Sequence, residues 1–499
     1  MGSKTKTKSK GNTGKVVGSL AVAEMSGEFD ASFKDVRLTR RTRALGNALS
    51  GQPDQSLPKL LDPAALEGAY RLLNHDDVHW RALHEPHHVQ TLRRSMDAAA
   101  PVLIIHDTTE ITFARYSSER LRSGLVSPSS RTQGMQLHVS FAVSGGEVPV
   151  PLGTLRAQPF VHAKHANAAG AETVAFWHAE AGLFDNEMRR WFDGVMQTQA
   201  HMGDLGVDAV HVADCEIDSF GLIAAMVERS IGMVVRCDGT RNLERGEVRE
   251  VGIATIALGE RGDLRPDRKV KAHPTRSARN AKVRMRAGSV TFKGASSRAQ
   301  ASWSPDPWEE QPHKITMNLV EVEEINPPAG EPPVRWLLLT TLPVDTAAQA
   351  LQVVQYYRRR WIIEEFFKAL KTGCGLQQRQ MESASAMLNM TALLLPVAWR
   401  LLALRTIGEQ QPDADWSAIL TPIEFEVLLA RNNGRSRSPR YQLTPDATAA
   451  QVLAAVARLG GHIPRNGRPG WQTLYAGWDK LSQLVEGAIL MKAIQRRRR

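Results

Sequence analysis

Cysteine is scarce in this chain of 499 residues, which has only Cys215, Cys237 and Cys374, no two of them with CxxC spacing. So few cysteines exclude a disulfide framework, and their spacing excludes a zinc site built from cysteine pairs. The sequence therefore favours a reducing, cytoplasmic environment.

Long apolar runs are also absent. The longest uncharged one, Ser383 to Trp399, has 17 residues and contains Pro396, whereas a membrane-spanning helix needs about 20. We predict a buried helix there. The N-terminus has no apolar signal core, and we expect residues 1–18, with lysines among Ser, Thr and Gly, to be a disordered basic tail.

Acidic residues are fewer than basic ones, 52 against 63, so the net charge is +11 with neutral histidines. The excess is clustered, because the segment from Arg261 to Arg298 has twelve Lys or Arg and two acids. Smaller basic clusters lie at 34–43, 358–360, 431–440 and 496–499. Each alone would be an ordinary solvated surface, but five on one chain favour a nucleic-acid backbone as partner.

Hydrophobic residues make up 42% of the chain, enough for substantial cores, and the length suggests about three domains. We predict short helices in residues 19–95, one starting near Asp35 and another capped by Asp62 with Pro63 in its first turn. Residues 381–499 have mainly helical patterns. The last helix has an apolar seam from Trp471 to Ala488 that suits packing on another helix.

Residues 96–380 contain strand and helix patterns in alternation. Short apolar or alternating runs predict strands at 101–107, 137–143, 148–155, 209–214 and 232–236. Strands joined by helices imply an α/β fold, a mixed sheet with flanking helices. The basic, Gly-rich residues 237–333 predict an inserted β subdomain with a hairpin turn at Ala287-Gly288.

Two aspartates, Asp107 and Asp214, end predicted strands. Ligands bind at strand ends in α/β sheets, so both are candidate site residues. The simpler explanation is that each caps local backbone, and position alone favours that explanation.

A long helix predicted from Thr346 to Thr372 shifts this balance. At about 100° per residue, four polar side chains fall within a sector of about 60°; they are Tyr357, Arg360, Glu364 and Lys371. A charged row is usually solvated, or contains an i,i+4 ion pair such as Arg360 with Glu364. On a helix this apolar, a polar row facing two aspartates favours a functional site.

Three converging carboxylates, Asp107, Asp214 and Glu364, would repel one another at neutral pH. Divalent cations relieve that repulsion, and Mg²⁺ or Mn²⁺ takes oxygen ligands. A pair of such ions about 4 Å apart can activate a nucleophile at a phosphodiester and stabilise the leaving oxygen.

Several motifs make the sequence recognisable. They are Ile105-His-Asp-Thr-Thr109, Val212-Ala-Asp214, Glu323-Glu-Ile-Asn-Pro-Pro328, Trp336-Leu-Leu-Leu-Thr340 and the Y-(2)-R-(3)-E-(6)-K signature from Tyr357 to Lys371. In these motifs the chain resembles the bacterial cut-and-paste DDE transposases, most closely the Tn-five group. Weaker similarity covers nearly all of the chain beyond the tail.

The resemblance implies an RNase H-like catalytic core in which Asp107, Asp214 and Glu364 bind Mg²⁺ or Mn²⁺, two ions per active site. It also implies a set of DNA contacts near the cut, made by Tyr357, Arg360, Lys371 and Arg236. Trp336 would stack on a flipped base at the transposon end, although it suits a strand core equally well.

The resemblance extends to partners. Residues 19–95 would bind the terminal inverted repeat, with the arginines of the first helix as DNA contacts: Arg37, Arg40, Arg41 and Arg43. Residues 381–499 would form a homodimer across two transposon ends, in the bacterial cytoplasm at the nucleoid. Enzymes of this family hydrolyse one strand, form a DNA hairpin with the freed 3′ hydroxyl, reopen it and join it to target DNA.

The chain departs from the family pattern at Cys215, Ile217, Gln378 and Gln380. These departures concern end-sequence preference and affinity rather than the chemistry. Two other functions stay open. An inactive DNA-binding repressor or architectural protein would more often have lost a ligand, and a nuclease without strand transfer would not need the basic insertion or the C-terminal seam.

One further motif is His84-Glu-Pro-His-His88, which fits the H-E-x-x-H signature of zinc proteases. Pro86 lies inside the helix that this signature requires and would kink it. We therefore interpret the pattern as chance, with the histidines on a linker or a helix surface.

Overall fold

The computed structural model describes residues 25, 27–99, 101–113, 133–182, 188–237, 243–244, 247–258, 279–293, 312, 314–381, 383–435 and 441–497. The predicted basic tail lies outside the described residues, as does most of the basic segment from Arg261 to Arg298.

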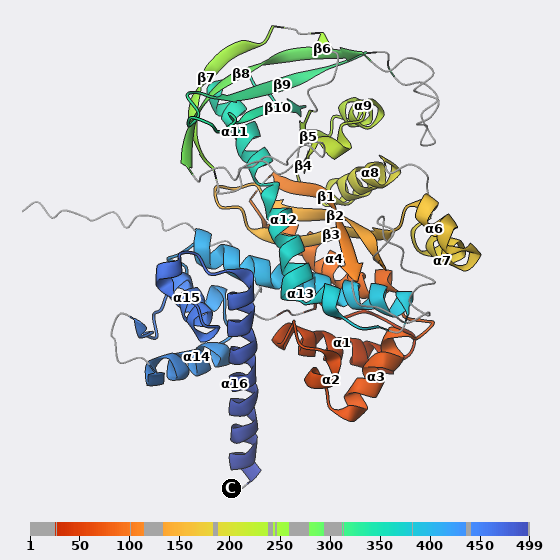
Figure 1. Cartoon of the computed structure of the whole chain (residues 1–499), viewed down its shortest axis with the longest axis vertical. Coiled ribbons are helices and arrows are strands. Elements are labelled where there is room, and N and C mark those ends of the chain that lie inside the picture. The colour runs from red at the N-terminus through yellow and green to blue at the C-terminus, as the bar shows by residue number, and fades with distance from the viewer. Residues whose placement is uncertain are drawn as a thin grey trace, which may run out of the picture.

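A ten-stranded mixed sheet forms the centre of the molecule (Figure 1). Its strands are β1 (Val102–Phe113), β2 (Gln133–Ser144), β3 (Pro151–Phe160), β4 (Ala209–Ala213), β5 (Gly232–Arg236), β6 (Leu243–Glu244), β7 (Arg249–Leu258), β8 (Arg279–Lys293), β9 (Lys314–Glu324) and β10 (Arg335–Thr340). Their order is β3-β2-β1-β4-β5-β10-β9-β8-β6, and β7 also pairs with β8. Only the β1–β4 and β4–β5 pairs are parallel. The predicted α/β fold with a large mixed sheet is confirmed.

The strand β1 is longer than its sequence predicts. Its first six residues, Val102 to Asp107, are buried, as in a strand covered on both faces. We predicted that it ends at Asp107, which is wrong, because the antiparallel partner β2 pairs with it as far as Phe113. The parallel partner β4 pairs only with Val102 to Ile105.

The strands of the predicted insertion continue the central sheet. β10 pairs with β5 of the core on one side and with β9 on the other. The hairpin turn predicted at Ala287-Gly288 is wrong, since β8 runs straight through both residues. Gly288 is needed there for close packing, because a Cβ on it would lie 2.1 Å from the Glu247 carbonyl oxygen.

Helices cover both faces of the sheet (Figure 1). The helices α8 (Met188–Asp204) and α9 (Phe220–Glu228) pack on one face, and α6 (Ala163–Ala169) and α7 (Ala171–Ala181) lie beside β3. The opposite face carries α4 (Trp80–Asp97), α11 (Ala347–Arg358), α12 (Trp361–Lys368) and α13 (Ala384–Gln410). This layering leaves the strand ends between β1 and β5 under α11 and α12.

The predicted helix from Thr346 to Thr372 is interrupted. Thr346 caps α11 in a capping box with Gln349, as a helix start should. The backbone N–H groups of Arg359 and Arg360 then donate to the carbonyls three residues earlier, as in a 3₁₀ turn. This turn separates α11 from α12. A π-helical segment, Ala369–Gly373, follows α12. Such local changes of helix type are common at functional sites.

The N-terminal helices are confirmed. They are α1 (Val36–Gly51), α2 (Leu57–Leu60) and α3 (Pro63–Leu73), and α1 and α3 pack on α13. The Asp35 side chain accepts from the Arg37 backbone N–H, and the Asp62 side chain accepts from two N–H groups of the first turn of α3. Both caps satisfy backbone donors that the helix leaves unpaired.

The apolar helix α13 is long and apolar enough to cross a membrane by length and composition, but its most apolar stretch is entirely buried in the molecule. Within the described residues it is the one helix of that kind. It contacts α4, β3, α12, α15 and the N-terminal helices. The predicted buried helix is therefore confirmed as a central core element.

The C-terminal helices are α14 (Pro422–Arg435), α15 (Ala449–Leu459) and α16 (Trp471–Arg497). The predicted seam packs as expected in the first half of α16, where Leu474, Trp478 and Leu481 are buried. In the second half Ile489, Leu490 and Met491 are more than half exposed. The last turns of α16 extend beyond α14 (Figure 1), to which Lys492 is still linked by an ion pair with Glu426 at 3.8 Å.

Candidate active site

Strand register places the two candidate aspartates together. The last two pairs of the parallel β1–β4 ladder are Ile104 with His211 and Ile105 with Val212. Asp107 and Asp214 each lie two residues beyond this last pair, and both carboxylates raise the pKa of Arg360. Both side chains are buried, at 0% and 3% exposure.

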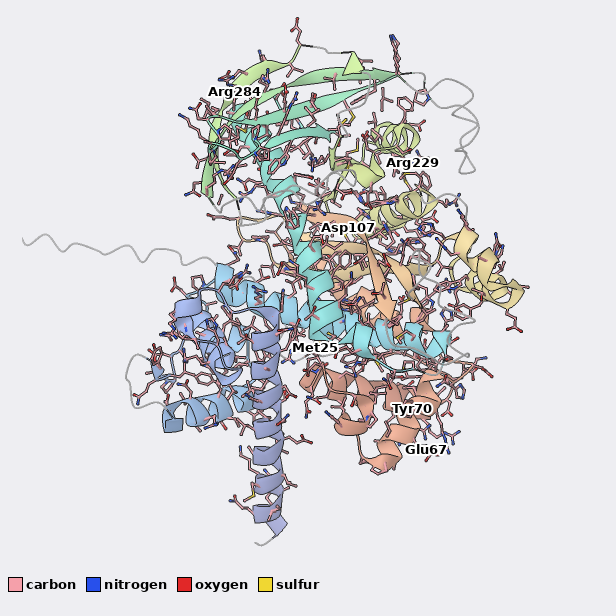
Figure 2. All side chains as sticks on the ribbon, in the orientation of Figure 1. Met25, Glu67, Tyr70, Asp107, Arg229 and Arg284 are labelled. Carbon is pink, nitrogen blue, oxygen red and sulfur yellow. The ribbon has the colours of Figure 1, made fainter. Side chains whose placement is uncertain are left out.

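The helix α12 brings the third carboxylate to the same face. The guanidinium Nη1 of Arg360 lies 3.1 Å from Asp107 Oδ2 and 3.5 Å from Glu364 Oε1. One nitrogen atom thus holds the carboxylates of Asp107 and Glu364 close to each other. Figure 2 shows Asp107 near the middle of the molecule, beside α12.

The charges of this cluster depend on one another. Burial alone would lower the pKa of Arg360, but the carboxylate of Asp107, with smaller effects from Tyr357, Asp214 and Glu364, raises it above its ordinary value. Burial also lowers the pKa of Lys371, while nearby Glu364, Glu110 and Asp107 oppose that change. Arg360 and Lys371 are therefore close to the same carboxylates, as the helical projection predicts.

Both aspartates also bond local backbone. Asp107 Oδ1 accepts from the Thr108 N–H at 2.8 Å, and Asp214 Oδ1 accepts from the Glu216 N–H at 2.9 Å. The capping explanation is therefore correct for both residues, and the same side chains stay candidates for the site. Each local hydrogen bond fixes one oxygen of the carboxylate and so fixes its rotamer.

Tyr357, Arg236 and Trp336 form the wall beside Asp214. The Tyr357 ring meets Trp336 edge-on at 5.4 Å between centroids, and both side chains are buried. Burial raises the pKa of Tyr357, while Arg360 and Arg236, the latter also a hydrogen-bond partner, act against it. In this structure Trp336 is a core residue, so stacking on a base would require it to leave Tyr357.

The donor set fits a divalent ion, since Mg²⁺ and Mn²⁺ prefer carboxylate oxygens. At present the Arg360 guanidinium supplies the positive charge between Asp107 and Glu364. Among the described residues no three His, Cys, Asp or Glu side chains are arranged to hold an ion. We therefore expect ion binding to require that Arg360 release at least one carboxylate.

The signature helix is also tied to the C-terminal helix, a link that the sequence analysis missed. Glu365, next to Glu364, accepts from Trp471 Nε1 of α16 at 2.8 Å. Tyr475 donates to the Ala369 carbonyl at 3.3 Å. The Tyr475 ring also lies so close to Gly373 that a Cβ on that residue would collide with it. No motif signals this anchor, because its two halves lie about a hundred residues apart.

The four predicted DNA-contacting arginines of α1 are exposed. Arg37 pairs with Asp35, and Arg43 pairs with Asp30. Arg40 and Arg41 have no ion-pair partner within the part of the chain that the structure describes. With Arg37 they have helix spacings of three and four residues, so they share one face.

The described part of the basic insertion is less positive than its composition suggests. Arg286 pairs with Glu321 and Glu323 across the β8–β9 ladder, and Arg335 also reaches Glu321. Arg279 pairs with Glu324 and Glu331, and Arg284 lies 3.5 Å from Glu250. Figure 2 shows Arg284 at the outer strands, far from Asp107. DNA phosphates would have to compete with these carboxylates.

The H-E-x-x-H motif is structural. Helix α4 continues through Pro86, and His84 and His88 are buried, so the predicted surface position is wrong. His87 is held at both nitrogens, by Glu28 at 2.5 Å and by the Thr154 N–H at 3.0 Å. His88 Nδ1 bonds the Leu155 carbonyl at 2.7 Å. These bonds join α4 to the sheet and to the N-terminal segment.

Acid should unfold this protein through its buried histidines. Burial lowers the pKa of His211 to about 3 and that of His84 well below its usual value near 6.5. Below pH 6.5 the unfolded chain therefore binds protons that the folded chain does not. Each such histidine should cost about 1.4 kcal/mol of stability per pH unit.

Thermal unfolding between pH 6.5 and 5, where most carboxyl groups stay ionised, measures this effect. We expect the midpoint to fall steeply over that range, and less steeply in a His84→Phe variant. A midpoint that does not change between these two pH values would contradict the prediction.

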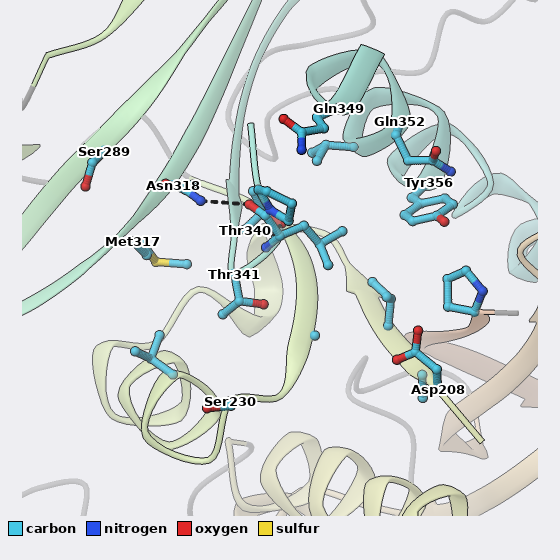
Figure 3. Close-up of a pocket in the computed structure, with 18 of the residues that line it drawn as sticks. Asp208, Ser230, Ser289, Met317, Asn318, Thr340, Thr341, Gln349, Gln352 and Tyr356 are labelled. Atoms are coloured by element: carbon cyan, nitrogen blue, oxygen red, sulfur yellow. Dashed lines mark hydrogen bonds between the residues drawn. The ribbon is translucent and has the colours of Figure 1, made fainter. Parts of the chain in front are cut away.

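A pocket of about 850 Å³ lies at the other end of the strands (Figure 3). Its lining includes Asp208, the residue just before β4, Ala209, the first residue of β4, and Thr340, the last residue of β10. Asp214 follows the opposite end of β4. The pocket is therefore separate from the carboxylate cluster.

Two family models match the chain. One described as transposase DNA-binding matches residues 25–78, which contain α1 to α3. One described as transposase DDE domain matches residues 197–396, which contain Asp214, the signature residues and half of α13. Asp107 lies before the second match.

The matches define a DNA-binding protein with a domain that acts on DNA. More particularly, they indicate a DDE transposase, in agreement with the resemblance that the motifs suggested. DDE domains of transposases generally use divalent metal ions and cleave and join DNA strands.

Proposed function

We propose that this chain is a cut-and-paste transposase of the Tn-five group. It excises a mobile element by strand hydrolysis and hairpin formation at the element's ends and joins the 3′ hydroxyls to target DNA. The observation that supports this proposal is the position of Arg360, whose Nη1 lies 3.1 Å from Asp107 Oδ2 and 3.5 Å from Glu364 Oε1, and whose pKa the Asp214 carboxylate also raises.

In this proposal the three carboxylates bind two Mg²⁺ or Mn²⁺ ions. When bound, such ions polarise a phosphodiester and lower the pKa of an attacking water or hydroxyl group. Before that, the single positive charge of Arg360 offsets part of the negative charge of Asp107, which is buried, and of Glu364, which is partly exposed. Thr108 N–H and Glu216 N–H keep the aspartate oxygens oriented.

DNA would approach from the α12 side. Lys371 and Arg236 stand beside the carboxylates and are proposed to contact phosphates, as are Tyr357 and Arg360 once DNA is bound. Trp336 is proposed to stack on an end base after leaving Tyr357. Arg40 and Arg41, exposed and lacking an acidic partner among the described residues, are the strongest candidates for contacts of α1 with the end sequence.

The remaining assignments follow the same proposal. An RNase H-like core is supported by the order β3-β2-β1-β4-β5, with three antiparallel strands continuing into two parallel ones. We divide the chain into residues 19–95 for end binding, 96–380 for catalysis and 381–499 for homodimer formation. The exposed apolar end of α16 supports the last of these. The protein would act in the bacterial cytoplasm, at the nucleoid.

Purified protein incubated with Mg²⁺ and DNA that carries the inverted repeats flanking its gene tests the proposal. Excision followed by joining to a target plasmid is the expected result. Nicking without joining would instead identify a nuclease, and retention of uncut DNA would identify a repressor or architectural protein.

A further inference from the structure

Three histidines lie on the sheet face opposite to Asp107 and Asp214. They are His106 of β1, His138 of β2 and His211 of β4, all at most 1% exposed. The rings of His106 and His211 are stacked at 5.1 Å between centroids, and His138 stacks on His106 at 6.2 Å. A buried polar group costs stability unless it is hydrogen-bonded, so the bonds of these rings are informative.

A hydrogen-bond chain connects two of the rings to α8 and β2. His211 Nε2 lies 3.0 Å from Gln199 Oε1, His106 Nε2 lies 2.8 Å from His211 Nδ1, and Ser140 Oγ lies 3.0 Å from His106 Nδ1. Because Gln199 Oε1 can only accept, His211 carries its hydrogen on Nε2 and accepts at Nδ1. His106 then donates from Nε2 and accepts the Ser140 hydroxyl. Every donor in the chain is used.

This hydrogen-bond chain runs across the strands where backbone pairing between β1 and β4 stops. The ladder ends at Ile105 with Val212, and both aspartates lie beyond that last pair. The bond from His106 to His211 joins the same two strands, one residue before Asp107 and three before Asp214. It adds a side-chain bond between the two strands at the end of the ladder, just before both aspartates.

The helix α8 seals this arrangement. Gly194 faces the rings, and a Cβ there would lie 3.0 Å from His138 Nε2 and 3.4 Å from His106 Nδ1. Trp191 meets His138 edge-on at 4.7 Å. The rings therefore have little room to move, as a spacer between strands requires.

We propose that His106 and His211 are positioning residues, whose mutual hydrogen bond sets the spacing of Asp107 and Asp214 for metal binding. This inference rests on the proposed function, because it takes the two aspartates as metal ligands. Groups that orient ligands from behind typically change metal affinity by about 10- to 100-fold when they are removed.

Mn²⁺ binding to the DNA-free protein, measured by titration with electron paramagnetic resonance, tests the proposal without any activity. His106→Phe and His211→Phe should each weaken Mn²⁺ binding about tenfold or more. The double variant should be no weaker than the singles, since both remove one shared bond. His106→Gln, whose amide can still donate to His211, should restore most of the affinity.

Matched controls separate this role from general damage. His88→Gln alters another buried histidine and should leave Mn²⁺ affinity unchanged, and binding of end DNA should change less than twofold in all variants. If His106→Phe does not fold, Ser140→Ala removes only a hydroxyl from the same chain and should still weaken Mn²⁺ binding measurably.

Wild-type Mn²⁺ affinity in the folded histidine variants, or strictly additive losses in the double variant, would overturn the inference. Asp107→Asn serves as the reference for the proposed function. If it binds Mn²⁺ like the wild type, the metal site itself is wrong. If it loses Mn²⁺ while the histidine variants do not, only the positioning role fails.

Discussion

Asp214→Asn is expected to reduce cleavage of end DNA by about 1000-fold or more while leaving end binding within a few-fold of wild type. The amide keeps the shape of the side chain and can still accept from the Glu216 N–H. It removes the charge that ligates a divalent ion, whose contribution to the transition state is several kcal/mol, and each 1.4 kcal/mol is a factor of ten in rate. Asp107→Asn and Glu364→Gln should behave alike.

Cleavage of labelled end DNA and gel retardation of the same DNA measure the two quantities in parallel. Asp204→Asn is a suitable control, because this exposed acid ends α8, before the start of β4 and so at the opposite end of that strand from Asp214; its cleavage rate should be nearly unchanged. Substantial residual cleavage in any of the three carboxylate variants would refute the assignment of that residue.

Arg360→Met should have the second large effect, on stability as well as on activity. Removing the guanidinium leaves the buried carboxylate of Asp107 and the partly exposed carboxylate of Glu364 without their countercharge. For a buried charge such as that of Asp107 this change typically costs about 3 to 5 kcal/mol. The thermal midpoint of the metal-free variant should therefore fall. Added Mn²⁺ should raise the thermal midpoint of the variant more than it raises the thermal midpoint of the wild type, because the ion then supplies the missing positive charge.

Differential scanning fluorimetry with and without Mn²⁺ gives both midpoints. Arg358→Met is the matched control, since Arg358, the last residue of α11, bonds a carbonyl of β7 and not the carboxylates. An equal Mn²⁺ response in Arg360→Met and wild type would show that the guanidinium and the ion do not share a site.

The sequence predicted the strands that carry both aspartates, but it could not predict that they meet. Asp107 and Asp214 follow the same end of the parallel β1–β4 ladder, whose two strands are separated by about a hundred residues and several other elements. Register depends on how all partners pack, and nothing in a single strand encodes it. The position of Asp107 inside β1, rather than at its end, has the same origin, since β2 extends the strand.

The helical projection was more successful, because helix geometry is local. It grouped Arg360 with Glu364, which the structure pairs, although the break at Arg359 and Arg360 changes the angle across it. The clustering of basic residues along the sequence was the least reliable guide to where positive charge gathers on the surface. The partners of Arg286 are acids on a neighbouring strand, and a count of basic residues along the sequence does not include them.

The docking of Trp471 on Glu365 has a practical consequence for shortened proteins. The helix whose apolar tip is exposed is fastened at its base beside Glu364. A chain truncated before Trp471 would lose this brace together with any pairing surface. Its loss of activity would then report two defects at once, whereas substitutions confined to Ile489, Leu490 and Met491 alter the tip and spare the brace.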